Sequence, residues 1–375
     1  MIHRTLAKTI LGGRKAGFIT IIYGPRRVGK TFLLKEIQKK FPEQKTLLLN
    51  GDTQESRDLL NTTSLTRLSE TVKNYSSIII DEAQRIPSIS LVLKILIDNF
   101  PEKNIIITGS TSLRLSRGVS ETLTGRTIKY YLYPLSTVEL TAEKTNIEKQ
   151  YFLPEQLIYG GYPYIQDLSS VEDKKRYLIS IIDDYLFQDI LDLKEVAVTD
   201  NLRKLATLLA YQIGQEVSFN ELSLSLKIDV KTVIRYIDLL KQGFIVFEVG
   251  AFSKNLRKEV VKNKKYYFWD LGIRNALLGL FTPLEARGDI GFLWENFLAV
   301  ERTKKVHYEN KIVQTYFWRT YDNAEIDWIE LEGQKISAYE FKWRSEKGKT
   351  PKSFFENYKE KVTIINKNNY LNFIA

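Results

Sequence analysis

The chain of 375 residues contains no cysteine and only two histidines, His3 and His307. The absence of cysteine excludes disulfide bonds and thiolate metal sites. Two histidines are too few for a histidine-based zinc site or for most nucleophilic triads that depend on a histidine base. Any chemistry performed by this chain therefore has to rest on carboxylates, lysines, hydroxyl groups and bound Mg²⁺.

Long apolar runs are also missing from the sequence. No stretch of about 18 or more apolar residues occurs, so a membrane-spanning helix is not expected. The first ten residues, MIHRTLAKTI, lack the apolar centre of a signal peptide. These features predict a cytoplasmic protein that does not interact with a membrane.

Apolar and basic residues, by contrast, are plentiful. Hydrophobic residues make up 43% of the chain and aromatic residues 12%, which is enough to build folded cores in about two or three domains. The net charge of +10 favours an anionic partner, and among such partners we expect nucleic acid, with DNA favoured. A generally basic composition without such a partner is the alternative. Self-association into a homo-oligomer is left open.

The strongest signal lies between residues 18 and 38. Residues 18–23 (FITIIY) are β-branched and aromatic, which predicts a buried strand, and residues 31–37 have the spacing of an amphipathic helix. Between strand and helix lies a full match to G-x-x-x-x-G-K-[ST]. The residues expected to bind the nucleotide are Gly24, Pro25, Arg26, Arg27, Val28, Gly29, Lys30, Thr31 and Phe32.

This spacing suits a triphosphate because backbone amides must wrap the anion, and glycine allows the closest approaches without a Cβ clash. The helix that starts near Gly29 directs the positive end of its dipole at the phosphates. Lys30 would contact the β- and γ-phosphates, and the Thr31 hydroxyl would ligate Mg²⁺. A chance match in an ordinary turn is the alternative, but the flanking strand and helix favour ATP binding.

A second strand, which leads into two acidic residues, follows the P-loop closely enough to belong to the same domain. Residues 78–80 are isoleucines that lead into Asp81 and Glu82. A buried strand of this kind would carry Asp81 to its carboxyl end, where the carboxylate can hold the Mg²⁺ shell. Glu82 would polarise the attacking water. A solvated acidic turn is the structural alternative.

Residues 104–110 predict a further buried strand that ends in hydroxylated residues. Thr108 or Ser110 would sense the γ-phosphate if this strand is inserted between the P-loop strand and the acidic strand, as in a wider class of ATPases. An ordinary cap at the end of the strand is the alternative for either residue alone. Arg126 precedes a fifth strand at residues 127–133 and is a candidate for stabilising charge in the transition state. An ordinary surface arginine is the alternative for Arg126. The alternation of strands and helices from residue 18 to 133 predicts a mostly parallel α/β sheet.

The middle of the chain reads as helical. Residues 171–214 carry apolar side chains at helical spacing, and residues 218–250 predict two short helices, a tight turn and a strand, the outline of a winged helix-turn-helix. Basic side chains that would face phosphates are Lys231, Arg235 and Lys241 on the second helix, and Lys262, Lys264 and Lys265 in the basic segment before Tyr266. A winged helix used for protein contacts, and a solvated wing loop, are the alternatives.

The last part of the chain contains a second group of candidate catalytic residues. Glu295 lies in a helical segment at 291–298, Asp327 in a strand at 325–329, and Glu340 and Lys342 in a strand at 338–343. Side chains alternate along a strand, so Glu340 and Lys342 share one face.

Ten motifs in this order resemble the bacterial and archaeal P-loop ATPases of the AAA-like group that carry a C-terminal domain of uncharacterised function. They are GPRRVGKT, IIIDEAQRIP, ITGSTS, LTGR, YGGYP, YYFWDLGIRN, FLWENF, FWRT, EIDW and EFKW. The resemblance implies an α/β fold with a P-loop parallel-sheet ATPase core (1–140), a helical region (141–215), a winged helix (216–270) and a restriction-endonuclease-like α/β domain similar to the PD-(D/E)XK nucleases (271–375).

The resemblance also suggests that Glu295, Asp327, Glu340 and Lys342 converge on one Mg²⁺ site. Asp327 and Glu340 would ligate the metal, Glu295 would hold its water shell, and Lys342 would neutralise the phosphate. The alternative is that Glu340 and Lys342 simply pair along their strand. The expected function is Mg²⁺-dependent ATP hydrolysis coupled to nucleic-acid binding. The alternative function is a nucleotide-switched DNA-binding regulator or scaffold with a non-catalytic C-terminal domain.

Overall fold

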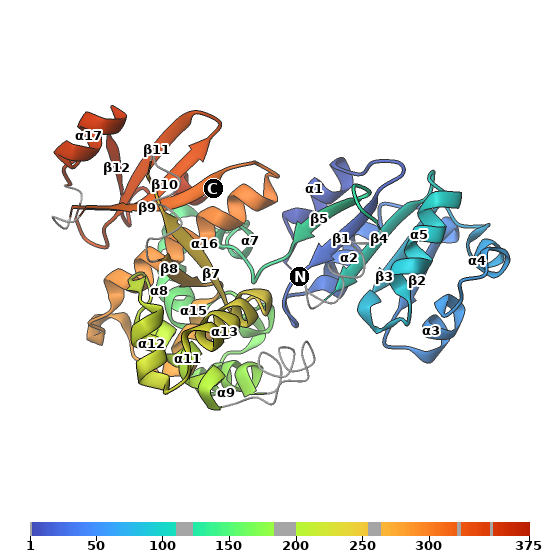
Figure 1. Ribbon diagram of the computed structural model, residues 1–375, viewed down its shortest axis with the longest axis horizontal. Coiled ribbons are helices and arrows are strands. Elements are labelled where there is room, and N and C mark those ends of the chain that lie inside the picture. The colour runs from blue at the N-terminus through green and yellow to red at the C-terminus, as the bar shows by residue number, and fades with distance from the viewer. Residues whose placement is uncertain (1, 110–122, 184–199, 254–263, 321–323, 346–347) are drawn as a thin grey trace. The chain divides into compact units, whose positions relative to one another are not determined.

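The computed structural model describes residues 2–109, 123–183, 200–253, 264–320, 324–345 and 348–375. These residues form two compact units, divided between Tyr133 and Pro134. The first unit is an α/β domain around a parallel sheet, and the second combines many helices with a larger sheet (Figure 1).

The first unit is built on a five-stranded sheet whose order is β2-β3-β4-β1-β5. Its strands are β1 (Ile19–Tyr23), β2 (Thr46–Asn50), β3 (Ser77–Asp81), β4 (Asn104–Gly109) and β5 (Thr127–Tyr131). Every pair of neighbours is parallel. The predicted parallel α/β sheet is therefore confirmed, and β4 is the expected strand between the P-loop strand β1 and the acidic strand β3.

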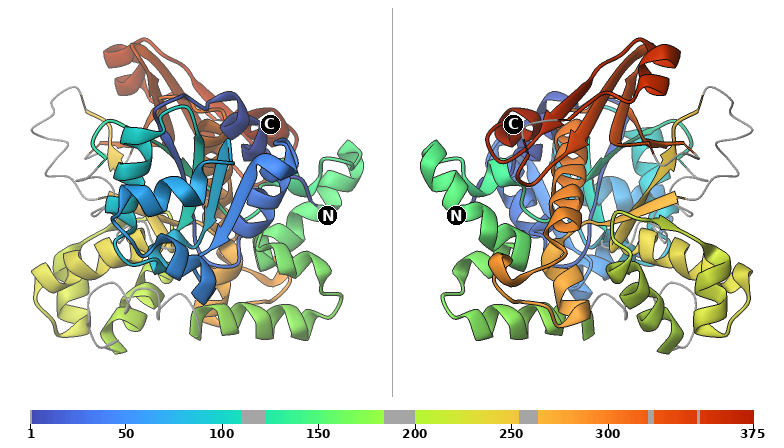
Figure 2. Two further views of the ribbon diagram at one scale, coloured as in Figure 1. Left: turned by 90° about the vertical axis from the view of Figure 1, so that its right-hand side faces the viewer. Right: turned by 90° about the vertical axis from the view of Figure 1, so that its left-hand side faces the viewer.

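Helices pack around this sheet, as Figures 1 and 2 show. They are α1 (Leu6–Gly12), α2 (Lys30–Gln38), α3 (Gln54–Leu60), α4 (Leu65–Val72) and α5 (Ile89–Asn99), with 3-10 turns η1 (Glu43–Lys45) and η2 (Ala83–Arg85). Strands β1 and β3 are buried at every position, as expected of central parallel strands covered on both faces. Isoleucine-rich strands suit this environment because no side chain faces water.

The first part of the second unit consists mainly of helices that are joined by short connections in the sequence. They are α7 (Thr137–Leu140), α8 (Asn146–Tyr159), α9 (Val171–Ile181), α11 (Asp200–Tyr211), α12 (Phe219–Leu226), α13 (Val230–Gln242) and α15 (Leu271–Leu278), with 3-10 turns η3 (Pro163–Asp167) and η5 (Leu284–Ala286). Local chemistry sets the starts of α12 and α13. Ser218 accepts a hydrogen bond from the Glu221 amide, and Asp229 accepts one from the Thr232 amide. The expected pair of short helices therefore forms.

A seven-stranded sheet runs through the second unit in the order β12-β11-β10-β9-β7-β8-β6. Its strands are β6 (Glu216–Val217), β7 (Val246–Ala251), β8 (Lys264–Phe268), β9 (Gln314–Arg319), β10 (Glu325–Glu332), β11 (Lys335–Phe341) and β12 (Val362–Ile365). Strands β7 and β9 pair in parallel, with Gly250 opposite Tyr316 and Ala251 opposite Phe317. The strands after α13 and the C-terminal strands thus form one continuous sheet.

Helix α16 (Ile290–Tyr308) is buried along most of its length, and α17 (Lys352–Tyr358) and α18 (Tyr370–Ile374) complete the unit. The ring of Trp294 on α16 packs against the rings of Phe297, Trp343 and Tyr370. Because α16 is buried almost all round, its charged side chains need partners inside the protein. No helix in the described part of the chain is both long and apolar enough to cross a membrane.

Candidate functional site

The P-loop connects the end of β1 to the start of α2. Arg27 and Gly29 both adopt left-handed backbone conformations, with φ of 64° and 92°. A Cβ atom on Gly24 would lie 2.3 Å from the carbonyl oxygen of Leu132, so this position has no room for a side chain. The loop then leads into α2, whose first amides have no acceptor within the helix. This arrangement provides the anion-binding backbone that the motif predicts.

Lys30 lies inside the loop and is 4% exposed. Its ammonium donates to the carbonyl oxygens of Gly24, at 3.2 Å, and Pro25, at 3.1 Å. It also lies 3.6 Å from the carboxylate of Glu82. The predicted phosphate-binding lysine and the predicted water-activating glutamate therefore meet at one place.

The Asp81 carboxylate lies between two hydroxyl groups. Thr31 at the start of α2 donates to Asp81 Oδ2 at 2.5 Å, and Thr108 of β4 donates to Asp81 Oδ1 at 2.5 Å. The contacts follow from the strand order, because the carboxyl ends of neighbouring parallel strands meet at one edge of the sheet. Thr31 and Asp81, expected to share Mg²⁺, are thus adjacent. Ser110 lies outside the described residues.

Glu82 has a left-handed backbone, with φ 47° and ψ 44°. A non-glycine residue in this region costs on the order of 1–3 kcal/mol and persists only where its surroundings hold it. Here the Glu82 amide donates to Asp81 Oδ1 and to Thr108 Oγ1. The Gln84 side chain in turn donates to the Glu82 carboxylate at 2.5 Å. These contacts keep the Glu82 carboxylate beside Lys30.

The sequence analysis did not anticipate the role of Arg4. This arginine is 3% exposed, and its guanidinium donates to the carbonyl oxygens of Val28, at 2.8 Å, and Tyr133, at 2.6 Å. Arg4 therefore supports the P-loop from a segment that lies before the P-loop strand. No local pattern marks it. Of the other predicted P-loop residues, Pro25 is buried, Arg26 and Phe32 are partly buried, and Arg27 is exposed.

Arg126 does not fit its predicted role at the nucleotide. Its carbonyl accepts a hydrogen bond from the amide of Ile19, the first residue of β1, so Arg126 lies at the opposite end of that strand from the P-loop. The guanidinium forms an ion pair with Asp98 of α5 at the surface. The surface interpretation is the one that this position supports, because a nucleotide in the P-loop of the same chain would lie a whole strand length away.

In the second unit, charged side chains gather around Lys265. A cavity of about 330 Å³ is lined by Glu216, Lys265, Glu295, Arg319, Glu325 and Asp327, among others. The Lys265 ammonium lies 2.9 Å from the Glu295 carboxylate and 2.6 Å from that of Glu325. The Tyr267 hydroxyl donates to the same Glu295 oxygen at 2.7 Å. Two predicted site residues, Glu295 and Asp327, thus line one cavity, together with a lysine and a glutamate that sequence reasoning did not assign to it.

The electrostatics of this cluster are dominated by burial. Burial, with the nearby Glu295 carboxylate adding to it and Lys265 opposing it, raises the pKa of Asp327 to about 7. Burial by itself would lower the pKa of Lys265, but the carboxylates of Glu295, Glu325 and Asp327 outweigh it and raise that pKa above its usual value. Lys265 is therefore a permanent cation, and Asp327 titrates near neutral pH.

Glu340 and Lys342 do not line this cavity. Their side chains form an ion pair at 2.6 Å, which is the alternative considered for them. Among the described residues, no group of three or more histidine, cysteine, aspartate or glutamate side chains is arranged to hold a metal ion. The predicted convergence of Glu295, Asp327 and Glu340 on one Mg²⁺ stays a prediction: Glu295 and Asp327 line this cavity, and Glu340 lies in β11 beside Asp327, whose Oδ2 accepts a hydrogen bond from the Phe341 amide. The ammonium of Lys265 lies among the carboxylates, and Glu340 is engaged by Lys342.

The predicted basic path before Tyr266 is also corrected in part. Lys265 is 1% exposed, so it cannot contact a nucleic-acid backbone. Lys264 forms an ion pair with Glu248 at 2.9 Å, and Lys241 pairs with the same glutamate at 2.9 Å. Residues 254–263, including Lys262, lie outside the described part of the chain. Lys231 and Arg235 on α13 are exposed, as expected.

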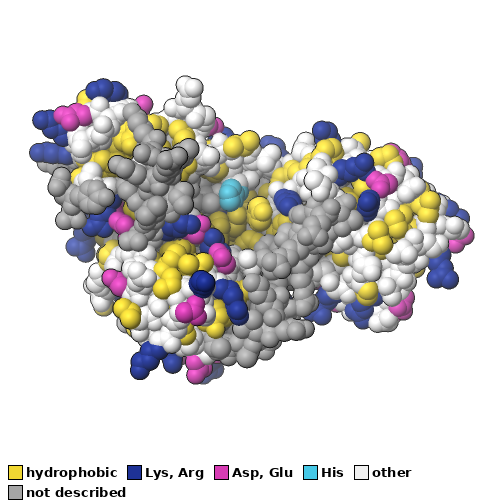
Figure 3. Space-filling model, in the orientation of Figure 1, with side chains coloured by type: hydrophobic (Ala, Val, Ile, Leu, Met, Phe, Trp, Pro, Cys, Tyr) yellow, Lys and Arg dark blue, Asp and Glu magenta, His cyan; other side chains and the backbone are white. Residues whose placement is uncertain are grey.

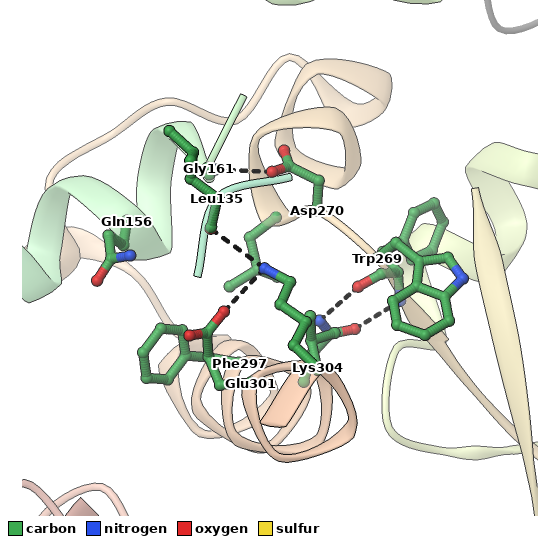
Figure 4. A pocket seen from close by; sticks show the side chains of 13 residues that line it. Leu135, Gln156, Gly161, Trp269, Asp270, Phe297, Glu301 and Lys304 are labelled. Atoms are coloured by element: carbon green, nitrogen blue, oxygen red, sulfur yellow. Dashed lines mark hydrogen bonds and ion pairs between the residues drawn. The ribbon is translucent and has the colours of Figure 1, made fainter. Parts of the chain in front are cut away.

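Residues of two sequence motifs line a second, much smaller cavity, where their contacts have a structural role. It measures about 20 Å³, about the size needed for one water molecule, and Figure 4 shows its lining. Lys304 donates to Glu301 at 2.8 Å and to the Leu135 carbonyl at 3.3 Å. Asp270 accepts a hydrogen bond from the Gly161 amide at 2.7 Å. The YGGYP and WDLGIRN segments thus contact each other beside α16.

Comparison with known proteins relates most of the chain to proteins without an assigned function. An uncharacterised protein of Mycobacterium tuberculosis is 30% identical over 325 residues, which cover 84% of this chain and 68% of that protein. This chain belongs to its family. Similar uncharacterised proteins occur in Methanocaldococcus jannaschii, with 25% identity over 331 residues (83% of this chain, 71% of that protein), and in Haemophilus influenzae, with 27% identity over 281 residues (70% of each).

Three domain families match successive parts of the chain. An AAA domain matches residues 16–141, and two domains of unknown function, DUF8612 and DUF4143, match residues 150–284 and 290–371. The AAA match contains the P-loop, Asp81, Glu82 and Thr108. The expectation of an AAA-like domain followed by a C-terminal domain of unknown function is confirmed.

Two solved structures share a distant likeness with the chain. AMPPCP-bound DnaA from Aquifex aeolicus is similar at a TM-score of 0.30 and 18% identity, covering 63% of this chain and 86% of that one. Pif1 helicase from Candida albicans is similar at a TM-score of 0.28 and 14% identity, covering 48% of each chain. At such low TM-scores neither likeness supports a conclusion about this protein.

Proposed function

We propose that this protein binds ATP together with Mg²⁺ at the P-loop and hydrolyses it. One observation carries the proposal: Lys30 meets Glu82, and Thr31 meets Asp81, at the carboxyl ends of β1 and β3. The AAA domain match over residues 16–141 supports the same activity. The residues fit the ligands, because the loop excludes a side chain at Gly24 and presents a helix start, a lysine and a hydroxyl–carboxylate pair.

Each residue has a distinct part in this proposal. Lys30 exchanges its carbonyl partners and Glu82 for the β- and γ-phosphates. Thr31 and Asp81 would hold Mg²⁺, which would neutralise phosphate charge when bound. Release from Lys30 leaves the Glu82 carboxylate with one fewer cationic neighbour, so that it can accept a proton from water. Thr108 holds the Asp81 carboxylate and the Glu82 amide in place.

We further propose that ATP hydrolysis is coupled to DNA through a winged helix formed by α12, α13, β7 and β8. The order of these elements and the exposed Lys231 and Arg235 on α13 support this proposal. Lys241 contributes less, because Glu248 already neutralises it. On the face shown in Figure 3, basic side chains are dispersed among acidic ones rather than joined in one patch. We therefore expect contacts to the phosphate backbone at a few positions rather than a continuous basic track.

For the C-terminal domain we propose a restriction-endonuclease-like fold that binds without cleaving. The antiparallel strands β9, β10 and β11, extended by the parallel strand β12 and backed by α16, support this fold. The Lys265 ammonium among the carboxylates supports the absence of cleavage. The protein would then act as a nucleotide-switched DNA-binding regulator, with chemistry confined to the ATP site.

The test is phosphate release from ATP by the full-length protein, measured alone and with single-stranded or double-stranded DNA or RNA at two salt concentrations. We expect Mg²⁺-dependent turnover that DNA increases, with the increase declining at higher salt because phosphate contacts release counterions. Lys35→Ala, on the exposed face of α2, is the matched control for Lys30→Ala. Turnover by the Lys30→Ala protein equal to that of the control would refute the ATP site. Turnover that is the same with and without every nucleic acid would refute only the coupling.

A further inference from the structure

The carboxylates of Glu295, Glu325 and Asp327 come from α16 and β10 and surround an ammonium that comes from β8. We propose that the Lys265 ammonium is the resident cation of this cluster, so that the pocket takes no divalent metal ion. This inference concerns the second unit and does not depend on ATP binding or hydrolysis. It also departs from the metal site that the family resemblance implies.

One oxygen of each carboxylate in the cluster is already engaged. A Mg²⁺, Mn²⁺ or Ca²⁺ ion requires carboxylate oxygens at about 2.0–2.6 Å. One Glu295 oxygen accepts from both Lys265 and Tyr267, and a Glu325 oxygen lies 2.6 Å from the ammonium. Asp327 Oδ2 accepts from the Phe341 amide at 2.7 Å. A divalent ion would have to displace at least the ammonium to reach these oxygens.

The position of Lys265 is also fixed by its place in the sheet. Lys265 is 1% exposed and lies in β8, where it pairs with Glu216 of β6 and with Val249 of β7. Its ammonium lies 5.4 Å from the centre of the Phe317 ring, which favours a cation at this place. Because side chains alternate between the two faces of a strand, the pairing of β8 with β6 and β7 fixes the face of the sheet on which the Lys265 side chain lies. The lysine is therefore a built-in part of the pocket.

Charge balance leads to the same conclusion. A buried charge is tolerated where it is paired and hydrogen-bonded, and removing one partner leaves the other uncompensated. Lys265 supplies a positive charge to the carboxylates of Glu295 and Glu325, and it joins β8, α16 and β10 in doing so. Replacing it by a neutral side chain of similar length would leave oxygens that face one another with no cation between them, which is the arrangement that binds a divalent ion.

The experiment is a titration of the nucleotide-free, full-length protein with Mn²⁺, in which free Mn²⁺ is followed by electron paramagnetic resonance. The variants are Lys265→Gln and its neighbour Lys264→Gln, whose lysine pairs with Glu248 outside the cluster. We expect Lys265→Gln to bind one additional Mn²⁺ that the wild type does not bind. Adding Asp327→Asn to Lys265→Gln should remove that ion, and Lys264→Gln should behave as the wild type. Asp81→Asn identifies any ion bound at the P-loop.

Two results would overturn the proposal. One is Mn²⁺ binding by the wild-type protein that Asp327→Asn abolishes, since the ammonium would then not exclude the metal. The other is a folded Lys265→Gln protein with no additional ion. If Lys265→Gln does not fold, as judged by circular dichroism, the wild-type titration with and without Asp327→Asn decides: a shared Mn²⁺ site refutes the proposal, and its absence supports it.

Discussion

The Lys30 ammonium lies 3.6 Å from the Glu82 carboxylate, and the same ammonium donates to two carbonyl groups of its own loop. The residue expected to bind phosphate thus also neutralises the residue expected to activate water. Phosphates that draw Lys30 away would change the charge around Glu82. In the function that we propose, this ion pair would link nucleotide binding to activation of the base.

Lys30→Ala should abolish ATP binding or turnover, because the phosphate charge loses its cationic partner within the loop. Binding can be measured by calorimetry and turnover by phosphate release. Circular dichroism of the same sample establishes that the variant is folded. ATP binding at wild-type affinity would show that the lysine does not contact the phosphates.

Glu82→Gln should leave ATP bound but slow its hydrolysis by about 10²-fold or more, since the substitution removes the proton acceptor and keeps the shape of the side chain. Single-turnover measurements separate the chemical step from binding. The exposed Glu43, replaced by glutamine, serves as the control. Wild-type turnover in Glu82→Gln would exclude this glutamate as the base.

Arg4→Gln should weaken ATP binding, because the carbonyl groups of Val28 and Tyr133 lose their donor and each unsatisfied group costs about 1–3 kcal/mol. We expect a rise in KM for ATP with a smaller change in kcat, together with a lower Tm. Arg4→Lys, which keeps the charge, should recover part of the affinity. Arg14→Gln, at the exposed end of the same segment, is the control. An unchanged KM would limit Arg4 to a purely structural role.

Charge reversal on α13 should weaken nucleic-acid binding evenly across sequences. Lys231→Glu with Arg235→Glu removes two expected phosphate contacts, so the slope of log affinity against log salt should fall by about two. Fluorescence anisotropy with several duplexes at three salt concentrations measures both quantities. The exposed Lys335, replaced by glutamate, controls for the change in net charge. An unchanged salt slope would mean that this face of α13 is only solvated.

Asp327 should make the stability of the protein depend on pH. Its folded-state pKa of about 7 lies above the ordinary value of 3.8, so the folded protein holds a proton that the unfolded chain releases. Stability should therefore fall as the pH rises from about 4 to about 7, by an amount on the order of 4 kcal/mol at most. Asp327→Asn should reduce this dependence, as measured by urea unfolding at pH 5 and pH 8.

The control for this measurement is Asp167→Asn, which replaces an exposed aspartate in the same unit. It should retain the wild-type difference in stability between pH 5 and pH 8. Equal pH dependence in Asp327→Asn and in the wild type would show that this carboxyl does not titrate in the folded protein near neutral pH.

Local sequence determined the first unit and its candidate site almost completely. The P-loop, the acidic strand and the inserted strand β4 each occupy a few consecutive residues, and their side chains meet because parallel strands bring their carboxyl ends to one edge of a sheet. The capped helices α12 and α13 were equally predictable, since caps and apolar periodicity act over a few residues. Each of these features is formed by residues that are close in sequence, and folding only brings the features together.

Tertiary structure alone decided the rest. Arg4 reaches Val28, Lys265 reaches Glu295 and Glu325, and β7 pairs with β9, all across long separations in sequence. A lysine before an aromatic run looks like part of a wing loop, and only strand register shows that it points into a buried carboxylate cluster. Likewise Arg126 could be recognised as remote from the P-loop only once its position beside Ile19, the first residue of β1, was known. Which charges meet depends on register and on sheet order, and short-range periodicity contains neither.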